Sequence, residues 1–480
     1  MSAVSASLRL GQVAVIVLLP LAAAASGGAF PAASKTPAPQ PRPAETLPAG
    51  GRPTPPPPVP PQYDELKDLH LEIPLVEGGR PSAAIVAPAS GIYHAAAAAI
   101  QRAIETRANV RLPIVADDSA EAAVPLAGHR IVLGNRSTSR TISALYDLYY
   151  CLVDLKYPGV EGYVLRSVHN PFGNGKSVVI VGGSDAAGVS DGAAALAEIL
   201  SKAPVAEGEM SIGWTMVTRL GKGVTPPAAI EDFEVWEASK GYGSSGYFGW
   251  TSISKRMAMY YMTGDALSAR EVIRLALPDK RAIREIEEID GERIENKHDP
   301  LAGLYHYNAH IAILFWDLIE ESPLFTDEER LKVTNAFARQ LNHRKGEGIY
   351  RLTRAPAGVG SRHGQWSAIS LYCLGRYFNK DYPHPVWEHS IRSAQLAFEP
   401  LHRHAWIAGE NDNLYWYNTG IAPVLTYMVL SGDRKPLESG VLGELLRGLE
   451  VLVSGRVPDW ALNYAALDFL KQPAVALLNL

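Results

Sequence analysis

The sequence YYMTGD at residues 260–265 recurs as YMVLSGD at 427–433 and, more loosely, as LGRYFNKD at 374–381. In each copy a helical pattern ends in a turn, and another helical pattern starts directly after it. Antiparallel helix pairs that repeat with similar corners are typical of helical toroids and solenoids. These segments therefore predict that residues 226–480 form an all-α domain built from helix pairs.

Helical periodicity extends through the rest of this region. Thr326, followed three residues later by Glu329, has the pattern of a capping box at a helix start. Because the predicted helices are few for a complete toroid, we expect either an incomplete one or further helices between residues 278 and 300. The predicted helices cover residues 252–262, 267–277, 304–321, 327–342, 365–378, 385–398, 415–430 and 437–454, and a last one begins near Trp460.

Strand and helix patterns alternate in the region before the helices, over residues 63–222. Strand patterns at 83–86, 112–115, 129–133, 162–166 and 177–181 are interleaved with helical patterns at 93–106, 139–153 and 185–200. Such alternation predicts a small sheet with helices packed on it. The expected fold class is therefore α+β and multidomain, with a small α/β sandwich domain followed by an all-α toroid that is either complete or incomplete.

A glycine-rich segment in this region has the sequence GNGKS at 173–177, which ends like a phosphate-binding loop. The first glycine of that motif would have to stand at position 170, which is Asn170, and a strand follows where the motif requires a helix. We therefore interpret the segment as a hairpin turn. Asp185, which ends GGSD at 182–185, is expected to cap the following helix.

The N-terminus has the features of an export signal. Arg9 precedes an apolar run over residues 13–25, and small residues suited to cleavage end that run. Residues 1–26 are therefore predicted to be a signal peptide, with an uncleaved anchor helix as the alternative. Proline dominates residues 27–62, which predicts an extended, disordered linker. The predicted localisation is secreted, periplasmic or in the cell envelope, with no stable membrane insertion after removal of the signal.

The length of the chain bounds the number of domains, and its net charge excludes some classes of binding partner. A chain of 480 residues is long enough for two domains. Its formal net charge of −5 argues against nucleic acid or an anionic membrane as the main partner. Cys151 and Cys373 lie in apolar surroundings and are expected to be buried free thiols instead of a disulfide.

Three polar and aromatic clusters each lie at the start of a predicted helix. They read YHYNAH at 305–310, SRHGQW at 361–366 and HRHAWIAGENDNLYWYNTG at 402–420. In a toroid, helix starts converge on one open end, so the three clusters could form one cleft. Tryptophan offers a flat face that suits sugar rings as well as protein cores. Core packing is the expectation for Trp316 and Trp387.

Two resemblances to known families follow from these residues. With Gly134-Asn135, GYVL at 162–165 and VIVGGSD at 179–185, the α/β region resembles the accessory domain that precedes the catalytic domain in hexosaminidases, alpha-glucuronidases and some polysaccharide lyases. With YNAH at 307–310, RHGQW at 362–366 and ENDN at 410–413, the helical region resembles helical-toroid polysaccharide lyases of the heparinase, alginate and chondroitin lyase type. The resemblance implies cleavage of an acidic polysaccharide without a cofactor.

The residue types in the clusters suit β-elimination of a uronate-containing polysaccharide. This reaction needs a donor that neutralises the carboxylate, a base that removes the adjacent carbon-bound proton, and an acid for the leaving oxygen. The candidate catalytic residues are His363, Tyr417, Tyr415, Arg362 and Asn308. The candidate substrate-binding residues are Trp366, Trp406, Trp416, His310, Asn411, Asn413 and Glu410, and no metal ligands are expected.

Alternative interpretations remain at this stage. Glycoside hydrolysis would require paired carboxyl groups, for which Glu410 and Asp412, with Glu347 or Asp317 as partners, are candidates. A non-catalytic glycan-binding protein would also fit the aromatic content. Several of the residues have structural explanations as well: Asp412 or Asn413 as a helix cap, one of Tyr415 and Tyr417 in the core, one of His306 and His310 as structural, and His402, His404 and Asp412 as solvated loop groups instead of metal ligands.

Overall fold

The computed structural model describes residues 59–125, 127–226, 251–290, 294–343, 348–403, 414–445 and 447. Within these ranges the side chains of residues 289, 307, 308 and 414–422 are not described. All described residues belong to one compact unit, Pro56–Leu480. The predicted signal peptide, almost all of the predicted linker, and the predicted helix near Trp460 lie outside the described residues.

A six-stranded mixed sheet forms the centre of the α/β region, in the order β10-β6-β7-β5-β3-β4. The parallel strands are β3, β4, β5 and β7, while β6 pairs antiparallel with β7 and β10. These strands cover Ala83–Ala87 (β3), Ile114–Ala116 (β4), His129–Gly134 (β5), Tyr163–Val168 (β6), Val178–Gly183 (β7) and Met216–Arg219 (β10). The mixed α+β class is confirmed.

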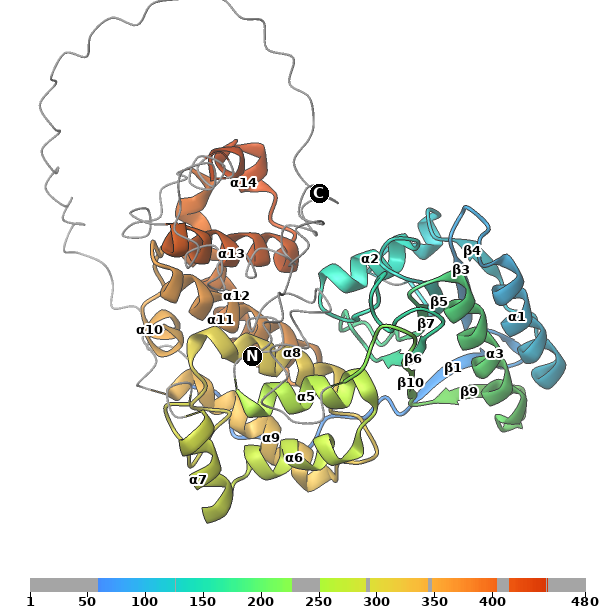
Figure 1. Ribbon diagram of the computed structural model, residues 1–480, viewed down its shortest axis with the longest axis horizontal. Helices are drawn as coiled ribbons and strands as arrows, with labels where there is room; N and C mark the ends of the chain where they lie inside the picture. The colour runs from blue at the N-terminus through green and yellow to red at the C-terminus, as the bar shows by residue number, and fades with distance from the viewer. Residues whose placement is uncertain are drawn as a thin grey trace, which may run out of the picture. The chain divides into compact units, whose positions relative to one another are not determined.

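Both faces of this sheet are covered, as the alternation of its side chains shows. Ile131 and Val179 pack in one core cluster with helices α1 (His94–Ala108) and α3 (Ala186–Lys202). Their neighbours Val132 and Ile180 belong to a second cluster, which contains α2 (Arg140–Asp147) and also most of the buried helical region. Because the side chains of a strand alternate between the two faces of the sheet, each strand contributes residues to both hydrophobic cores. Figure 1 shows α1 and α3 along the face opposite to α2.

A second, four-stranded antiparallel sheet was not predicted. Its order is β2-β1-β9-β8, and its strands cover Glu72–Glu77 (β1), Arg80–Pro81 (β2), Val205–Ala206 (β8) and Glu209–Gly213 (β9). Ile73, Leu75 and Ile212 from this sheet pack into the same core as α1 and α3.

The local predictions for the glycine-rich segment and the helix caps are confirmed. β6 and β7 form an antiparallel hairpin around GNGKS, where Gly175 donates its N–H to Oδ1 of Asn170 at 2.8 Å. Asp185 caps α3 by accepting from the N–H of Gly188. The capping box of Thr326 and Glu329 is present at the start of α9.

The helical region follows the predicted order with two additions. α7 and α10 were not predicted individually, although helices between 278 and 300 had been considered. The predicted helix at 437–454 is interrupted, because α14 ends at Glu438 and Gly440 has a φ of 83°. The helices are α5 (Ser252–Thr263), α6 (Ala266–Ala276), α7 (Lys280–Ile289), α8 (His306–Ile319), α9 (Asp327–Arg339), α10 (Ile349–Arg354), α11 (Arg362–Asp381), α12 (Pro385–Phe398), α13 (Leu414–Ser431) and α14 (Lys435–Glu438).

Two of the repeated corners have the same construction. Gly264 follows α5 with a φ of 77°, and Gly432 follows α13 with a φ of 70°; glycine adopts this left-handed conformation without strain. Asp265 and Asp433 come next: Asp265 accepts from the backbone N–H groups of Leu267 and Ser268, and Asp433 accepts from the backbone N–H of Lys435, each at the start of the following helix. The shared sequence therefore encodes a shared helix–turn–helix corner.

Helices α8 and α11 lie side by side and run in the same direction. Three contacts show this, because their numbering rises together along both helices: His306 with His363, His310 with Trp366, and Glu320, which follows α8, with Tyr377. The end of α5 also lies at the end of α8, where Tyr261 contacts Phe315. Helix α12 returns antiparallel to α11, since Phe378 late in α11 stacks on Trp387 at the start of α12.

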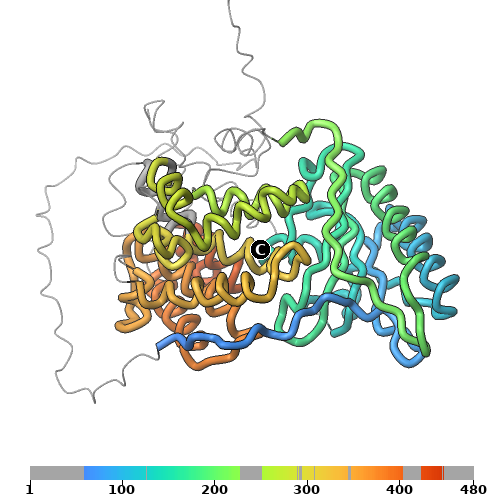
Figure 2. The backbone as a smooth tube through the Cα atoms, turned by 90° about the horizontal axis from the view of Figure 1, so that it is seen from below, coloured from blue at the N-terminus to red at the C-terminus, as the bar shows by residue number. Residues whose placement is uncertain are grey.

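Residues 59–71 form a strap between the linker and the first strand (Figure 2). Tyr63 exchanges hydrogen bonds with Asn335 of α9 and accepts one from Nε1 of Trp387 at 2.7 Å. The side chain of Lys67 is buried and contacts Glu320 at 2.5 Å, Glu321 at 3.0 Å and Asp381 at 3.1 Å. The strap is therefore an integral part of the helical core.

Within the described ranges, no helix has the length and apolar character needed to cross a membrane.

Candidate functional site

Two of the three polar clusters meet where α8 and α11 begin. The Nε2 atom of His306 lies 2.7 Å from the Nδ1 atom of His363, and the two rings are 4.7 Å apart in a T-shaped arrangement. His306 is the first residue of α8, and His363 is the second residue of α11. The parallel packing of the helices therefore converts two separate sequence clusters into one hydrogen-bonded pair of imidazoles.

Local structure fixes this pair in place. Ser361 caps α11 by accepting from the N–H of Gly364, so the turn that carries His363 has a defined geometry. Ser370 of α11 donates a hydrogen bond to the backbone carbonyl of His306 at 3.4 Å, which holds the start of α8 against α11. The ring of Tyr305 packs on His306 with centroids 3.9 Å apart.

The two imidazoles differ in their surroundings. His306 is 4% exposed, whereas His363 and the adjacent Arg362 are half-buried. Burial, together with the charges of His363 and Arg362, lowers the pKa of His306 to about 3. His306 is therefore neutral at ordinary pH, and His363 is the member of the pair that can reach solvent.

One turn further along, His310 stacks on Trp366 with ring centroids 4.9 Å apart. Both are buried, and burial alone lowers the pKa of His310 to about 3. The sequence analysis assigned both to substrate binding. In this structure the stacked pair is packed between the helices, which favours a supporting role for both residues over an open sugar platform.

The remaining predicted site residues are not placed by the described structure. Asn308 lies in the first turns of α8, and Tyr415, Trp416 and Tyr417 lie in the first turn of α13, but their side chains are not described. Trp406, Glu410, Asn411 and Asn413 lie outside the described residues, as do Glu347, His404 and Asp412.

Two of the alternative site assignments lose support. Asp317, considered as the partner of a hydrolytic carboxyl pair, is buried in an ion pair with Lys380 at 2.5 Å. His402, considered as a metal ligand, contacts Asp433 at 2.7 Å at the corner after α13. Among the described side chains, no group of three or more His, Cys, Asp or Glu residues is arranged to hold a metal ion.

The expectations for other residues of interest are borne out. Cys151 and Cys373 are buried free cysteines, and burial raises the pKa of both thiols. Trp316 and Trp387 are fully buried in the core.

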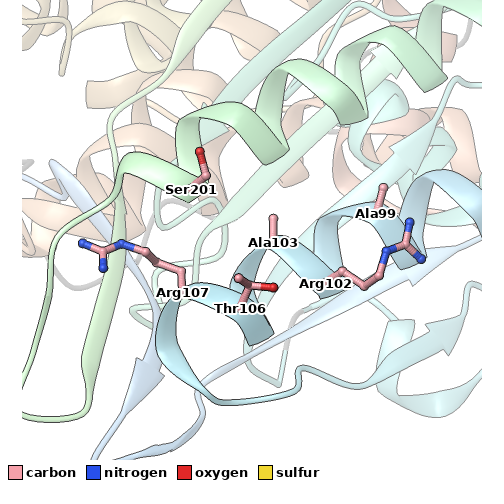
Figure 3. A pocket seen from close by; sticks show the side chains of 6 residues that line it. All are labelled: Ala99, Arg102, Ala103, Thr106, Arg107 and Ser201. Carbon is pink, nitrogen blue, oxygen red and sulfur yellow. The ribbon is translucent and has the colours of Figure 1, made fainter.

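A groove of about 420 Å³ lies between α1 and α3, far along the chain from the clusters. Figure 3 shows that the side chains of Arg102 and Arg107 point to opposite sides of it, and Arg107 donates to the carbonyl of Ala203 at 2.8 Å. Its lining includes no carboxylate, imidazole or thiol. The groove therefore offers neither a converging anion site nor an acid–base pair.

Comparison with known proteins adds no assignment: no protein-family model matches the chain, and no curated protein matches its sequence.

Proposed function

We propose that this protein is a carbohydrate-active enzyme that cleaves a uronate-containing polysaccharide by β-elimination, with His363 as the base. The observation that carries this proposal is the 2.7 Å contact between His306 and His363 at the paired starts of α8 and α11. It combines a buried neutral imidazole with an accessible one beside an arginine, which are the components that proton abstraction next to a carboxylate requires.

In the proposed reaction, Nε2 of His363 removes the proton from the carbon that carries the uronate carboxylate. The electron pair of that C–H bond forms a double bond to the neighbouring ring carbon. The bond from this second carbon to the glycosidic oxygen breaks, and the leaving oxygen takes up a proton from an acid. The products are a new non-reducing end with an unsaturated uronate and a new reducing end, so that atoms and electrons balance.

Arg362 is assigned to the substrate carboxylate. Its charge already acts on His306, so the guanidinium lies close to the imidazole pair. A guanidinium can bind a carboxylate through two parallel N–H donors, which neutralises the charge and stabilises the carbanion that develops beside it. Asn308, in the first turn of α8, is proposed as a second donor to the same group.

The position of His363 suits a base. It lies in the first turn of α11, next to Arg362 and in contact with the ring of His306. Histidine is the side chain that most often serves as a general base. Tyr415 or Tyr417, in the first turn of α13, is proposed as the acid for the leaving oxygen.

The proposed architecture is an α/α toroid preceded by the small α/β domain. Support comes from α8 and α11, which run in the same direction, and from α12, which returns antiparallel to α11. In a toroid of helix pairs, such an arrangement places the starts of the inner helices at one end. Export through the predicted signal at residues 1–26 would bring the enzyme to extracellular or envelope polysaccharides.

Product analysis tests this function. The protein is incubated separately with a panel of uronate polysaccharides and with a neutral polysaccharide, and both ultraviolet absorbance and new reducing ends are measured. Elimination predicts equal numbers of double bonds and reducing ends with at least one uronate polymer. Reducing ends without double bonds would support hydrolysis instead, and binding without either product would support a glycan-binding protein.

A further inference from the structure

A short loop, residues 355–361, leads from α10 into α11, whose first turn carries Arg362 and His363. Within this loop only Val359 is buried, at 8% exposure, whereas the glycines on either side of it are exposed. We propose that Val359 is a positioning residue of the candidate site: its side chain packs against Gly364 and thereby sets where the first turn of α11 presents Arg362 and His363. This inference rests on the proposed function only for its effect on turnover.

Helix α12 sets the position of Val359. The backbone N–H of Val359 donates to the carbonyl of Ala397 at 3.0 Å, in the last turn of α12. At Gly358 the backbone passes so close to Pro400 that a Cβ there would lie 2.5 Å from Cγ of the proline. Because α12 also packs antiparallel along α11, the loop is held relative to α11 by contacts outside its first turn.

The side chain of Val359 meets the first turn of α11 at Gly364, which is buried. A Cβ at Gly364 would lie 3.0 Å from Cβ and 3.1 Å from Cγ1 of Val359. The ordinary separation of two carbon atoms in contact is about 3.5–4.0 Å. The valine therefore lies directly against the backbone of this turn, and a glycine is the residue that leaves room for it.

This contact acts on the residues that directly precede Gly364. The N–H of Gly364 donates to Oγ of Ser361 at 3.3 Å, so His363 lies in a turn that this hydrogen bond closes and Val359 supports. Nδ1 of His363 lies 2.7 Å from Nε2 of His306, and a small shift of the turn would alter this contact. Reaction rates are sensitive at this scale, since a misplacement of about 1 Å can cost roughly 100-fold.

Three variants test the positioning role through turnover. Gly364→Ala adds a methyl group that meets Val359, and it should lower kcat roughly 10- to 100-fold. The variant should stay folded, because alanine is a better helix former than glycine. Val359→Ala removes Cγ1 from the contact, so the double variant should be several-fold faster than Gly364→Ala. A double variant no faster than Gly364→Ala would overturn the proposal, because the two residues would then not act through one contact.

The matched control is Gly443→Ala. Gly443 is helical, and a Cβ there would have only Nη1 of Arg447 within 4 Å, at 3.8 Å, so there is room for the methyl group. This variant should keep the native rate. A loss of activity equal to that of Gly364→Ala would show a general effect of alanine in helices and would also overturn the proposal.

A second measurement does not depend on turnover. The ring signals of carbon-13-labelled histidine, assigned with His363→Ala, report the surroundings of His363. The inference predicts that these signals move in Gly364→Ala, return towards their native positions in the double variant, and stay unchanged in Gly443→Ala. If Gly364→Ala does not fold, Val359→Ala alone decides, since removal of the supporting side chain should move the same signals.

The two measurements separate this inference from the proposed function. Ring signals of His363 that do not move would overturn the positioning role, even if the enzyme forms unsaturated product. Signals that move and return as predicted, without product on any uronate polymer, would leave the positioning intact and refute the proposed lyase reaction.

Discussion

At the scale of single residues, Arg362 carries the charge on which the proposed elimination depends. Arg362→Ala removes the group assigned to the substrate carboxylate, so kcat should fall roughly 100- to 1,000-fold, the cost typical of losing a donor to developing negative charge. Arg362→Lys keeps the charge but loses the two-pronged geometry, and it should recover only part of the activity. Initial rates of double-bond formation measure both.

One result would contradict the assignment of Arg362 to the substrate carboxylate. If Arg362→Ala turns over at the native rate while it retains the native melting temperature, another residue neutralises the carboxylate. A loss of activity together with a large loss of stability would instead indicate a structural role, because Arg362 is only half-buried and its removal should leave the core intact.

Residue types in the sequence were sufficient to select His363 and Arg362 but not to identify the partner of His363. His306 and His363 are separated by 57 positions, and only the parallel packing of α8 and α11 brings their rings together. His306 contacts His363, whereas His310, one helical turn later, stacks on Trp366. Helical periodicity places both histidines on the same face of the helix, so it does not predict which of them pairs with His363. The role of Trp366 could not be predicted either, because a tryptophan beside a polar loop can form a sugar-binding platform or a buried stack equally well.

At the scale of elements, the strap at residues 59–71 should be critical for stability. The side chain of Lys67 is buried among Glu320, Glu321 and Asp381, and these charges raise its pKa well above the ordinary value although burial opposes the charge. Lys67→Met would leave buried carboxylates without this cation. Such a loss costs about 3–5 kcal/mol of unfolding free energy.

An exposed ion pair provides the matched control. Lys202 contacts Glu198 at 2.7 Å on the surface of α3, with both side chains mostly exposed. Lys202→Met should change the unfolding free energy by less than about 1 kcal/mol. Urea unfolding of both variants compares them directly. If both variants changed the unfolding free energy by similarly small amounts, the ion pairs of Lys67 would not stabilise the strap.

The main helices and the central strands could be predicted because their apolar periodicity is long and regular. The short elements could not. β2 and β8 contain two residues each, and β1 has Pro74 beside a shift in register, where proline argues against a strand. α10 spans only Ile349–Arg354, too short for helical periodicity to show. α7 carries a usable signal, because Asp279 caps it by accepting from two backbone N–H groups.

At the scale of the whole molecule, buried histidines predict a loss of stability in mild acid. The pKa of His129 and of His169 is lowered to about 4, mainly by burial, and that of His306 and His310 to about 3. The unfolded chain therefore binds more protons than the folded one below pH 6.5. Their contribution to stability is present above that pH and declines as the pH falls.

One buried group acts in the opposite direction. Burial raises the pKa of Glu320 to about 6, so its protonation favours the folded state as the pH falls from 6 towards its ordinary value near 4.5. Four histidines outweigh this single carboxyl, and the melting temperature should fall between pH 6.5 and 4.5. A stability that is constant or rises over this interval would contradict the assignment of neutral buried histidines.

The His169→Asn variant isolates one contribution to this pH dependence. It should be less stable than the native protein at pH 7 but lose less stability towards pH 4.5, by an amount on the order of 2 kcal/mol for a single fully buried histidine. Thermal unfolding at a series of pH values provides the comparison.

The central claim is that His363 removes a proton in an elimination reaction, and the rate of double-bond formation tests it most directly. The assay compares the native protein, His363→Ala and the control His94→Ala, which changes an exposed histidine at the start of α1. We predict that the native protein and His94→Ala form unsaturated uronate at equal rates, and that His363→Ala is at least ~100-fold slower with an unchanged melting temperature. A native rate in folded His363→Ala, or reducing ends that form without the double bond, would contradict the account.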